Sequence, residues 1–95
     1  MKISDVGAVD REVMLIAQEE CAEVTQAISK VFRFGFDSEY DGRTNKDRLE
    51  EEIGDLMCML QMMAERDLID WTRVSLAAGA KKLKLKTWSN IDANS

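Results

Sequence analysis

The sequence predicts a single all-α domain, and three observations support that prediction. Proline is absent from all 95 residues, so no position removes a backbone donor from the interior of a helix. Apolar residues recur with helical spacing in three separate segments. The first two segments are separated by residues 35–44, which are rich in glycine and aspartate, and these residues favour turns and loops.

The first helix is predicted from about Asp10, a good N-cap residue, to about Phe32. The second helix is capped by Thr44 or Asn45, and Asp47 is favourable in its first turn. Each helix carries an apolar stripe that needs a packing partner. The stripes consist of Val13, Ile16, Ala17, Val24, Ala27, Ile28 and Val31 in the first helix, and of Leu49, Ile53, Leu56, Leu60, Met63 and Ala64 in the second.

A third helix is predicted from about Trp71 to Lys86, after a short break at residues 67–70. The polar tail, from about residue 87 to residue 95, is expected to fray. The expected core positions of the third helix are Val74, Ala77, Ala78 and Leu85.

Self-association is expected because a single short chain buries only a modest fraction of its surface. Small domains compensate with disulfides, metals or oligomerisation. The two cysteines, Cys21 and Cys58, lack the paired spacing of a disulfide or zinc framework, so we expect reduced thiols within the core. The second helix is apolar over more than one face, which is typical of a helix with several neighbours. We therefore expect a four-helix core that is completed by dimerisation.

The composition argues against several classes of protein. Thirteen basic and eighteen acidic residues give a net charge of −5, which disfavours binding to nucleic acid backbones. The absence of histidine removes the commonest general base and the usual zinc ligand. No segment approaches the roughly 20 apolar residues that cross a bilayer, and the N-terminus does not read as a signal peptide. We expect a cytoplasmic protein that binds neither nucleic acid nor membranes.

Several carboxylates stand where apolar residues would be expected. Glu20 lies at the centre of the first apolar stripe, Glu23 at its edge, and Glu19 further round the same flank. Residues three apart are neighbours on a helix surface, so Glu20 and Glu23 can converge on one point. In the second helix, Glu52 and Asp55 repeat this spacing beside the apolar stripe.

A divalent cation explains these acids best. A buried carboxylate is unfavourable unless it takes up a proton or finds a partner, and four acids on facing helices repel one another. Mg²⁺ prefers oxygen ligands, so the pattern predicts a magnesium site formed by Glu20, Glu23, Glu52 and Asp55. The alternative is that the acids pair with basic residues of another subunit or lie at a hydrated helix edge.

The two acidic motifs resemble those of the MazG-like, all-α nucleoside triphosphate pyrophosphohydrolases. That family carries Glu-Glu-x-x-Glu on one helix and Glu-x-x-Asp on the next, and the matching segments here are residues 19–23 and 52–55. The segment 33–37, followed by Thr44 and Asn45, is similar to a subset with an extended inter-helix loop that occurs in phages and bacteria. The resemblance is specific over residues 19–56.

The resemblance implies an enzyme that hydrolyses (d)NTPs to (d)NMPs and pyrophosphate. Water attacks the α-phosphorus in a magnesium-dependent reaction, and Mn²⁺ is expected to substitute for Mg²⁺. Glu20, Glu23, Glu52 and Asp55 would be the metal ligands, and Glu19 would orient or deprotonate the water. The family's core implies a homodimer or a dimer of dimers, in a bacterial cytoplasm or in a host cytoplasm if the protein is phage-encoded.

The charge of the substrate requires basic partners. Lys30 lies on the acid-bearing flank of the first helix, and Arg33 begins the loop. Lys81 and Lys84 belong to a basic cluster at the end of the third helix. We expect these four residues to contact phosphate, although solubility and favourable interaction with the helix dipole would also explain the lysines of that cluster.

The base and the sugar require a second set of contacts. Trp88 is a candidate for stacking on the base, and Asn45 for hydrogen bonding to the base edge or a sugar hydroxyl. Phe34 and Phe36, which flank Gly35, either form a wall of the pocket or hold the loop in place.

Two other functions remain compatible with the residues. One is a phosphoribosyl-ATP pyrophosphohydrolase, which uses similar acids to cleave the same bond on the same scaffold. The other is a non-catalytic helical adaptor whose acidic groove binds a basic partner. Release of pyrophosphate in the presence of Mg²⁺ would exclude the adaptor.

Overall fold

The computed structural model describes residues 2–91 and confirms the all-α class. The elements, in chain order, are a 3₁₀ turn η1 (Ile3–Asp5), the helix α1 (Ala8–Phe34), the short strands β1 (Glu39–Tyr40) and β2 (Arg43–Thr44), and the helices α2 (Asn45–Glu65) and α3 (Trp71–Trp88). The tail that was predicted to fray spans residues 87–95, and residues 92–95 of it lie outside the described range. Trp88, predicted to follow the third helix, is its last residue.

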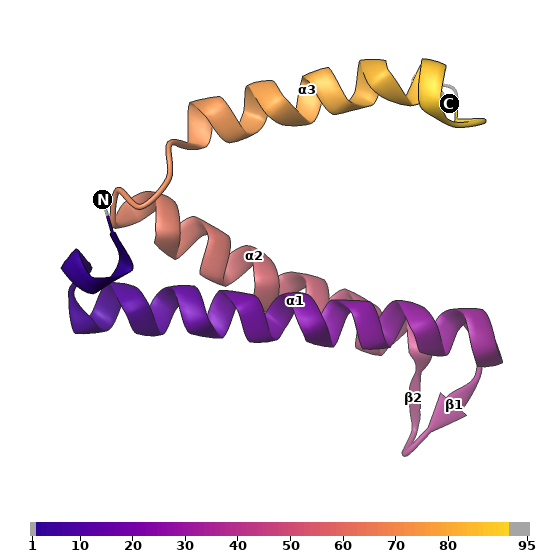
Figure 1. Cartoon of the computed structure of the whole chain (residues 1–95). Helices are drawn as coiled ribbons and strands as arrows, with labels where there is room; N and C mark the ends of the chain where they lie inside the picture. The colour runs from indigo at the N-terminus through magenta and orange to yellow at the C-terminus, as the bar shows by residue number, and fades with distance from the viewer. Residues whose placement is uncertain (1, 92–95) are drawn as a thin grey trace.

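The two long helices α1 and α2 run antiparallel and pack along much of their length (Figure 1). Val13 and Ala17 of α1 meet Met59 of α2 in the buried core, and Ala27 is buried nearer the other end of α1. Ile16, Met62 and Met63 pack against this core. The predicted stripes are therefore confirmed in part, but Ile28 and Ile53 are 43% and 42% exposed.

The helix α1 begins at Ala8, and its N-cap is Gly7, three residues before the predicted cap Asp10. Gly7 has an extended backbone, and its carbonyl accepts the first helical hydrogen bond from the N–H of Arg11. Asp10 lies in the first turn, where the helix dipole favours an acid. Its carboxylate pairs with Arg66, the C-cap residue that follows α2.

A two-stranded hairpin joins α1 to α2, in the segment predicted as a loop. Glu39 pairs with Thr44 and Tyr40 with Arg43, and both residues of the connecting turn, Asp41 and Gly42, have positive φ angles of 56° and 76°. This is the backbone of a type I′ turn, for which Asp-Gly is a preferred sequence. The hairpin is held against α2 by an ion pair between Arg43 and Glu51.

The helix α2 begins at a cap of two reciprocal hydrogen bonds. The backbone N–H of Asp47 donates to Oγ1 of Thr44, and the N–H of Thr44 donates to Oδ2 of Asp47, each at 3.0 Å. Of the two predicted caps, Thr44 and Asn45, Thr44 is therefore the N-cap of α2. Because a helix repeats every 3.6 residues, fixing its first turn also fixes the direction in which Glu52 and Asp55 point.

The helix α3 lies apart from the α1–α2 pair (Figure 1). Asp70 caps it by accepting hydrogen bonds from the N–H groups of Thr72 and Arg73. No residue of α3 is buried, so the core positions predicted there are wrong for a single chain. Those residues are Val74, Ala77, Ala78 and Leu85, of which Leu85 alone is half-buried.

The two thiols lie on the surface of the single chain. Cys21 and Cys58 are free and both are exposed, so the core in which they were expected is not formed by a single chain. Cys21 lies on α1 and Cys58 on α2, and the faces by which these two helices pack on each other do not include either cysteine.

Between residues 2 and 91, no helix combines the length and the apolar composition that are needed to cross a membrane.

Candidate metal centre

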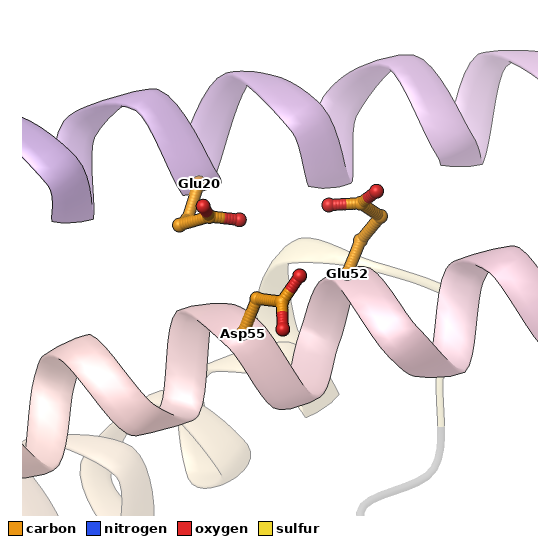
Figure 2. Close-up of side chains that lie close together, drawn as sticks. All are labelled: Glu20, Glu52 and Asp55. Atoms are coloured by element: carbon orange, nitrogen blue, oxygen red, sulfur yellow. The ribbon is translucent and has the colours of Figure 1, made fainter.

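Three carboxylates converge between α1 and α2. One oxygen each from Glu20, Glu52 and Asp55 lies within 4.8 Å of the other two. Figure 2 shows Glu20 pointing from α1 toward α2, and Glu52 and Asp55 pointing back from α2. We call these three residues the acid cluster.

The position of the acid cluster follows from helical spacing. Glu20 comes three residues after Ala17, which is buried in the core, so its side chain lies on the face of α1 that packs on α2. Glu52 and Asp55 are also three apart and share the facing side of α2. Glu20 and Glu52 are half-buried, and Asp55 is exposed.

The electrostatics of the cluster are unfavourable when all three groups are ionised. Burial raises the pKa of Glu20 above its ordinary value, and the nearby charges of Asp55, Glu23 and Glu19 raise it further. Burial also raises the pKa of Glu52, followed by the charges of Glu23, Asp55, Glu20 and Glu51. Desolvation and like charges both disfavour an ionised carboxylate, so the cluster favours a positive partner.

One atom of the cluster gives an independent indication. Oε2 of Glu20 is buried and has no hydrogen-bond partner among the described residues. A buried acceptor without a partner is costly, and natural proteins rarely contain one that nothing satisfies. The donor set is entirely oxygen, which suits a hard divalent cation such as Mg²⁺ better than a softer transition metal. The residues therefore fit a magnesium site.

The other two predicted acids lie next to the cluster. Glu23 is exposed, and its charge acts on both Glu20 and Glu52, although it is not among the three whose oxygens converge. Glu19 is exposed on α1, and its charge acts on Glu20. All five acids of the two motifs therefore surround one place in the fold.

A small cavity of about 40 Å³ lies beside the acid cluster, between α1 and α2. We call it the inter-helix cavity. Glu52 belongs both to its wall and to the acid cluster. Its lining residues are Glu23, Gln26, Ala27, Lys30, Asn45, Arg48 and Glu52.

A larger cavity of about 300 Å³ lies under the hairpin and shares Lys30, Asn45 and Arg48 with the first. We call it the hairpin cavity. Asn45 also ties the loop to the helix, because its Nδ2 donates to the carbonyl of Gly35 at 2.9 Å. The complete lining is Lys30, Phe34, Ser38, Glu39, Tyr40, Asn45 and Arg48.

Arg48 is a site residue that the sequence analysis missed. It lines both cavities, its Nη2 donates to the carbonyl of Tyr40 at 2.8 Å, and its guanidinium lies 5.8 Å from the centre of the Tyr40 ring. Its position four residues before Glu52 was the available signal, since residues four apart share a helix face.

The remaining predicted substrate contacts lie elsewhere in a single chain. Arg33 is exposed, and its guanidinium lies over the ring of Phe34 rather than in either cavity. Lys81, Lys84 and Trp88 are exposed on α3, which does not pack on the acid-bearing helices. Their contact with a substrate stays a prediction, and it requires α3 of another copy or a different position of α3.

Fold and site together define an all-α protein with a carboxylate centre suited to a divalent cation between two antiparallel helices. The model of the MazG nucleotide pyrophosphohydrolase domain matches residues 10–87, which include every residue of both cavities and of the acid cluster. The chain therefore belongs to the MazG nucleotide pyrophosphohydrolase family. No curated protein and no solved structure matched the chain significantly.

Proposed function

We propose that this protein is a magnesium-dependent nucleoside triphosphate pyrophosphohydrolase that converts a (d)NTP and water to a (d)NMP and pyrophosphate. The observation that carries the proposal is the acid cluster, in which a buried oxygen of Glu20 has no partner among the described residues. Membership of the MazG nucleotide pyrophosphohydrolase family supports the same reaction class.

The metal-binding role falls to Glu20, Glu52 and Asp55, with Glu23 as the fourth ligand. Glu23 is close enough for its charge to raise the pKa of both Glu20 and Glu52, so a cation between the helices would relieve this repulsion too. A bound Mg²⁺ would neutralise charge on the phosphate oxygens and lower the pKa of a water molecule. Mn²⁺ also accepts oxygen ligands and should replace it.

The reaction breaks one phosphoric anhydride bond. The oxygen of water forms a bond with the α-phosphorus, and the bond between that phosphorus and the bridging oxygen breaks, so that pyrophosphate leaves with the electron pair. The proton of the water passes to a carboxylate, and we assign this role to Glu19. Glu19 is exposed and lies on α1 beside Glu20, outside the acid cluster, so its carboxylate remains available as a base.

The basic residues near the cluster neutralise the substrate. Lys30 lines both cavities and is the predicted phosphate contact that shares the wall of the inter-helix cavity with Glu23 and Glu52. Arg48 also lines both cavities, and its planar guanidinium suits phosphate oxygens. Positioning and charge neutralisation account for most of the catalysis of phosphoryl transfer, so both residues should contribute to turnover.

Self-association is part of the proposal, because a single chain leaves too much apolar surface uncovered. Four apolar residues of the described range are buried, whereas Leu76 and Leu83 of α3 are 69% and 66% exposed. A helix that is apolar on several faces packs against several neighbours. A second copy would supply them, as a homodimer or as a dimer of dimers, and would bring a second α3 toward the site.

A pyrophosphate-release screen tests the proposed function. The full chain is incubated with each ribo- and deoxyribonucleoside triphosphate and with phosphoribosyl-ATP, with Mg²⁺, with Mn²⁺ and with EDTA. We expect metal-dependent release from at least one nucleoside triphosphate. Selective release from phosphoribosyl-ATP would instead indicate the enzyme of histidine biosynthesis. No release from any compound with either metal would contradict an enzymatic function and favour a helical adaptor.

A further inference from the structure

We infer that the hairpin cavity binds the nucleoside end of the substrate, with the phosphate chain passing Lys30 and Arg48 toward the acid cluster. The inference rests on the proposed function and adds the site that selects the substrate. It follows from three observations. They concern the wall that the two cavities share, the charges along that wall and in the hairpin cavity, and the aromatic rings of the hairpin cavity.

The first observation is the continuity of the two cavities. Lys30 and Arg48 belong to the walls of both, and Glu52 belongs both to the inter-helix cavity and to the acid cluster. A molecule that contacts the acid cluster and the hairpin must therefore pass the two cations. A nucleotide has the matching order, with a charged phosphate chain at one end and an apolar, planar base at the other.

The second observation concerns charge. The hairpin cavity has one acid, Glu39, on the strand β1, whereas Lys30 and Arg48 stand at the wall that it shares with the inter-helix cavity. A phosphate group would be repelled at the Glu39 end and attracted at the shared wall. The charges therefore direct the phosphates toward α1 and α2 and the nucleoside toward the hairpin.

The third observation concerns shape and ring chemistry. The hairpin cavity measures about 300 Å³, at the lower end of the usual range for small-molecule sites. Phe34 and Tyr40 line it, and they are 62% and 73% exposed. Exposed aromatic rings in a cavity offer stacking surfaces to any base. The backbone of Tyr40 is held by a hydrogen bond from Nη2 of Arg48 to its carbonyl, and the guanidinium of Arg48 lies 5.8 Å from the centre of the Tyr40 ring.

The test compares nucleotide analogues with inorganic tripolyphosphate, which carries three linked phosphates but no nucleoside. Binding of the α,β-methylene analogues of the four common ribonucleoside triphosphates and of inorganic tripolyphosphate is measured by calorimetry, on the full chain with Mg²⁺. Phe34→Ala and Tyr40→Ala each remove one ring, and neither residue is buried, so both variants should fold. Phe32→Ala is the matched control, since Phe32 is 87% exposed on α1 and does not line the cavity.

We expect Phe34→Ala and Tyr40→Ala each to weaken binding of the best analogue roughly 5- to 100-fold, the range for loss of one stacking ring. Tripolyphosphate affinity should change by less than about 2-fold in both, because the phosphate contacts remain. Lys30→Ala and Arg48→Ala should weaken both probes, and Phe32→Ala neither.

The outcomes separate the inference from the proposed function. If the wild-type protein releases pyrophosphate but Phe34→Ala and Tyr40→Ala affect the analogue no more than Phe32→Ala does, the inference is wrong and the proposed function stands. If the wild-type protein binds analogues but releases no pyrophosphate, the proposed function is wrong, and the same variant comparison decides the inference. Absence of any binding by the wild-type protein would contradict both.

Discussion

Glu20 of α1 and Asp55 of α2 face each other across the helix pair, with carboxylate oxygens within 4.8 Å. Their charges oppose each other without a cation, so Glu20→Gln should raise the thermal stability of the metal-free protein. The same change should abolish the stabilisation that Mg²⁺ gives the wild-type protein and reduce pyrophosphate release on the order of 100-fold or more.

Thermal melts with EDTA and with Mg²⁺ check this prediction, together with the release assay and a circular dichroism spectrum that should remain helical. The control is Glu12→Gln, which removes an exposed acid from the same helix outside the cluster. An equal Mg²⁺-induced shift in Glu20→Gln and the wild-type protein would contradict the metal site.

Loss of the cap at the start of α2 should destabilise the protein. In Thr44→Ala, the hydroxyl that accepts the hydrogen bond from the N–H of Asp47 is absent. The free energy of unfolding should fall by about 0.5–2 kcal/mol, measured by urea denaturation. Thr44→Ser retains the hydroxyl and should stay close to the wild-type value. Equal stabilities of the two variants would show that the hydroxyl does not contribute.

The pH dependence of stability follows from two opposite pKa changes. The hydrogen bond from the backbone N–H of Thr44 lowers the pKa of Asp47, so its stabilising effect is present above the unfolded value of about 3.9 and is lost as the pH falls through the lower folded pKa. Burial raises the pKa of Glu20 and Glu52, so the folded state binds more protons than the unfolded chain between the two values.

The metal-free protein should therefore become more stable as the pH falls from 7 toward the ordinary glutamate pKa of about 4.3, and less stable as the pH falls below the ordinary aspartate value of about 3.9. Urea denaturation across this range, in EDTA, checks both limbs of the curve. Asp47→Asn should reduce the loss of stability at acid pH, and Glu20→Gln should reduce the gain of stability as the pH falls from 7. A profile that neither substitution changes would assign the pH dependence to other groups.

A side chain at Gly35, the C-cap of α1, should destabilise the protein. Its backbone angles, φ 89° and ψ 162°, lie in a region that is essentially restricted to glycine. Gly35→Ala should lower the free energy of unfolding by about 1–3 kcal/mol through backbone strain alone, because a Cβ would meet no atom within 4 Å. Gly79→Ala, in a helical backbone with equally open space, should instead raise it by about 0.5–1 kcal/mol. Chemical denaturation of the two variants should give opposite signs.

Self-association should depend on the exposed leucines of α3. Leu76 and Leu83 are seven residues apart and therefore share one face of that helix. The double variant Leu76→Glu/Leu83→Glu should shift the protein toward a monomer in light-scattering measurements. Ser75→Glu adds an acid on another face and should retain the wild-type mass. A wild-type protein that is monomeric at all soluble concentrations would contradict the assembly.

The sequence was sufficient for the parts of the fold that depend on local rules. The absence of proline and the apolar spacing predicted three helices, and Thr44 and Asp47 carry the cap that was one of the predicted alternatives. The spacing of Glu20, Glu52 and Asp55 placed them on facing helix surfaces, and the structure brings their oxygens together. Helical periodicity was informative here because α1 and α2 pack on each other within one chain.

The failures have physical causes as well. The start of α1 was misplaced because Gly7 caps the helix through its backbone, whereas Asp10 was expected to cap it through its side chain. The hairpin was missed because its strands have two residues each, too few for an alternating pattern, although Asp41 and Gly42 carried the turn signal. Leu85 and its neighbours were expected in a core that one chain does not form.

The reciprocal hydrogen bonds between Thr44 and Asp47 mark the boundary between the hairpin and the helix that carries Glu52 and Asp55. Since the helical phase of Glu52 and Asp55 is set by the residues that follow Thr44, residues can be exchanged, added or removed in the hairpin without rotating the acids. If the hairpin cavity selects the nucleoside as inferred, changes at residues 36–43 should alter which nucleotide is recognised and leave the proposed hydrolysis intact. An engineer who swaps hairpins between relatives and keeps Thr44 through Asp55 should transfer substrate preference and leave the hydrolytic step in place.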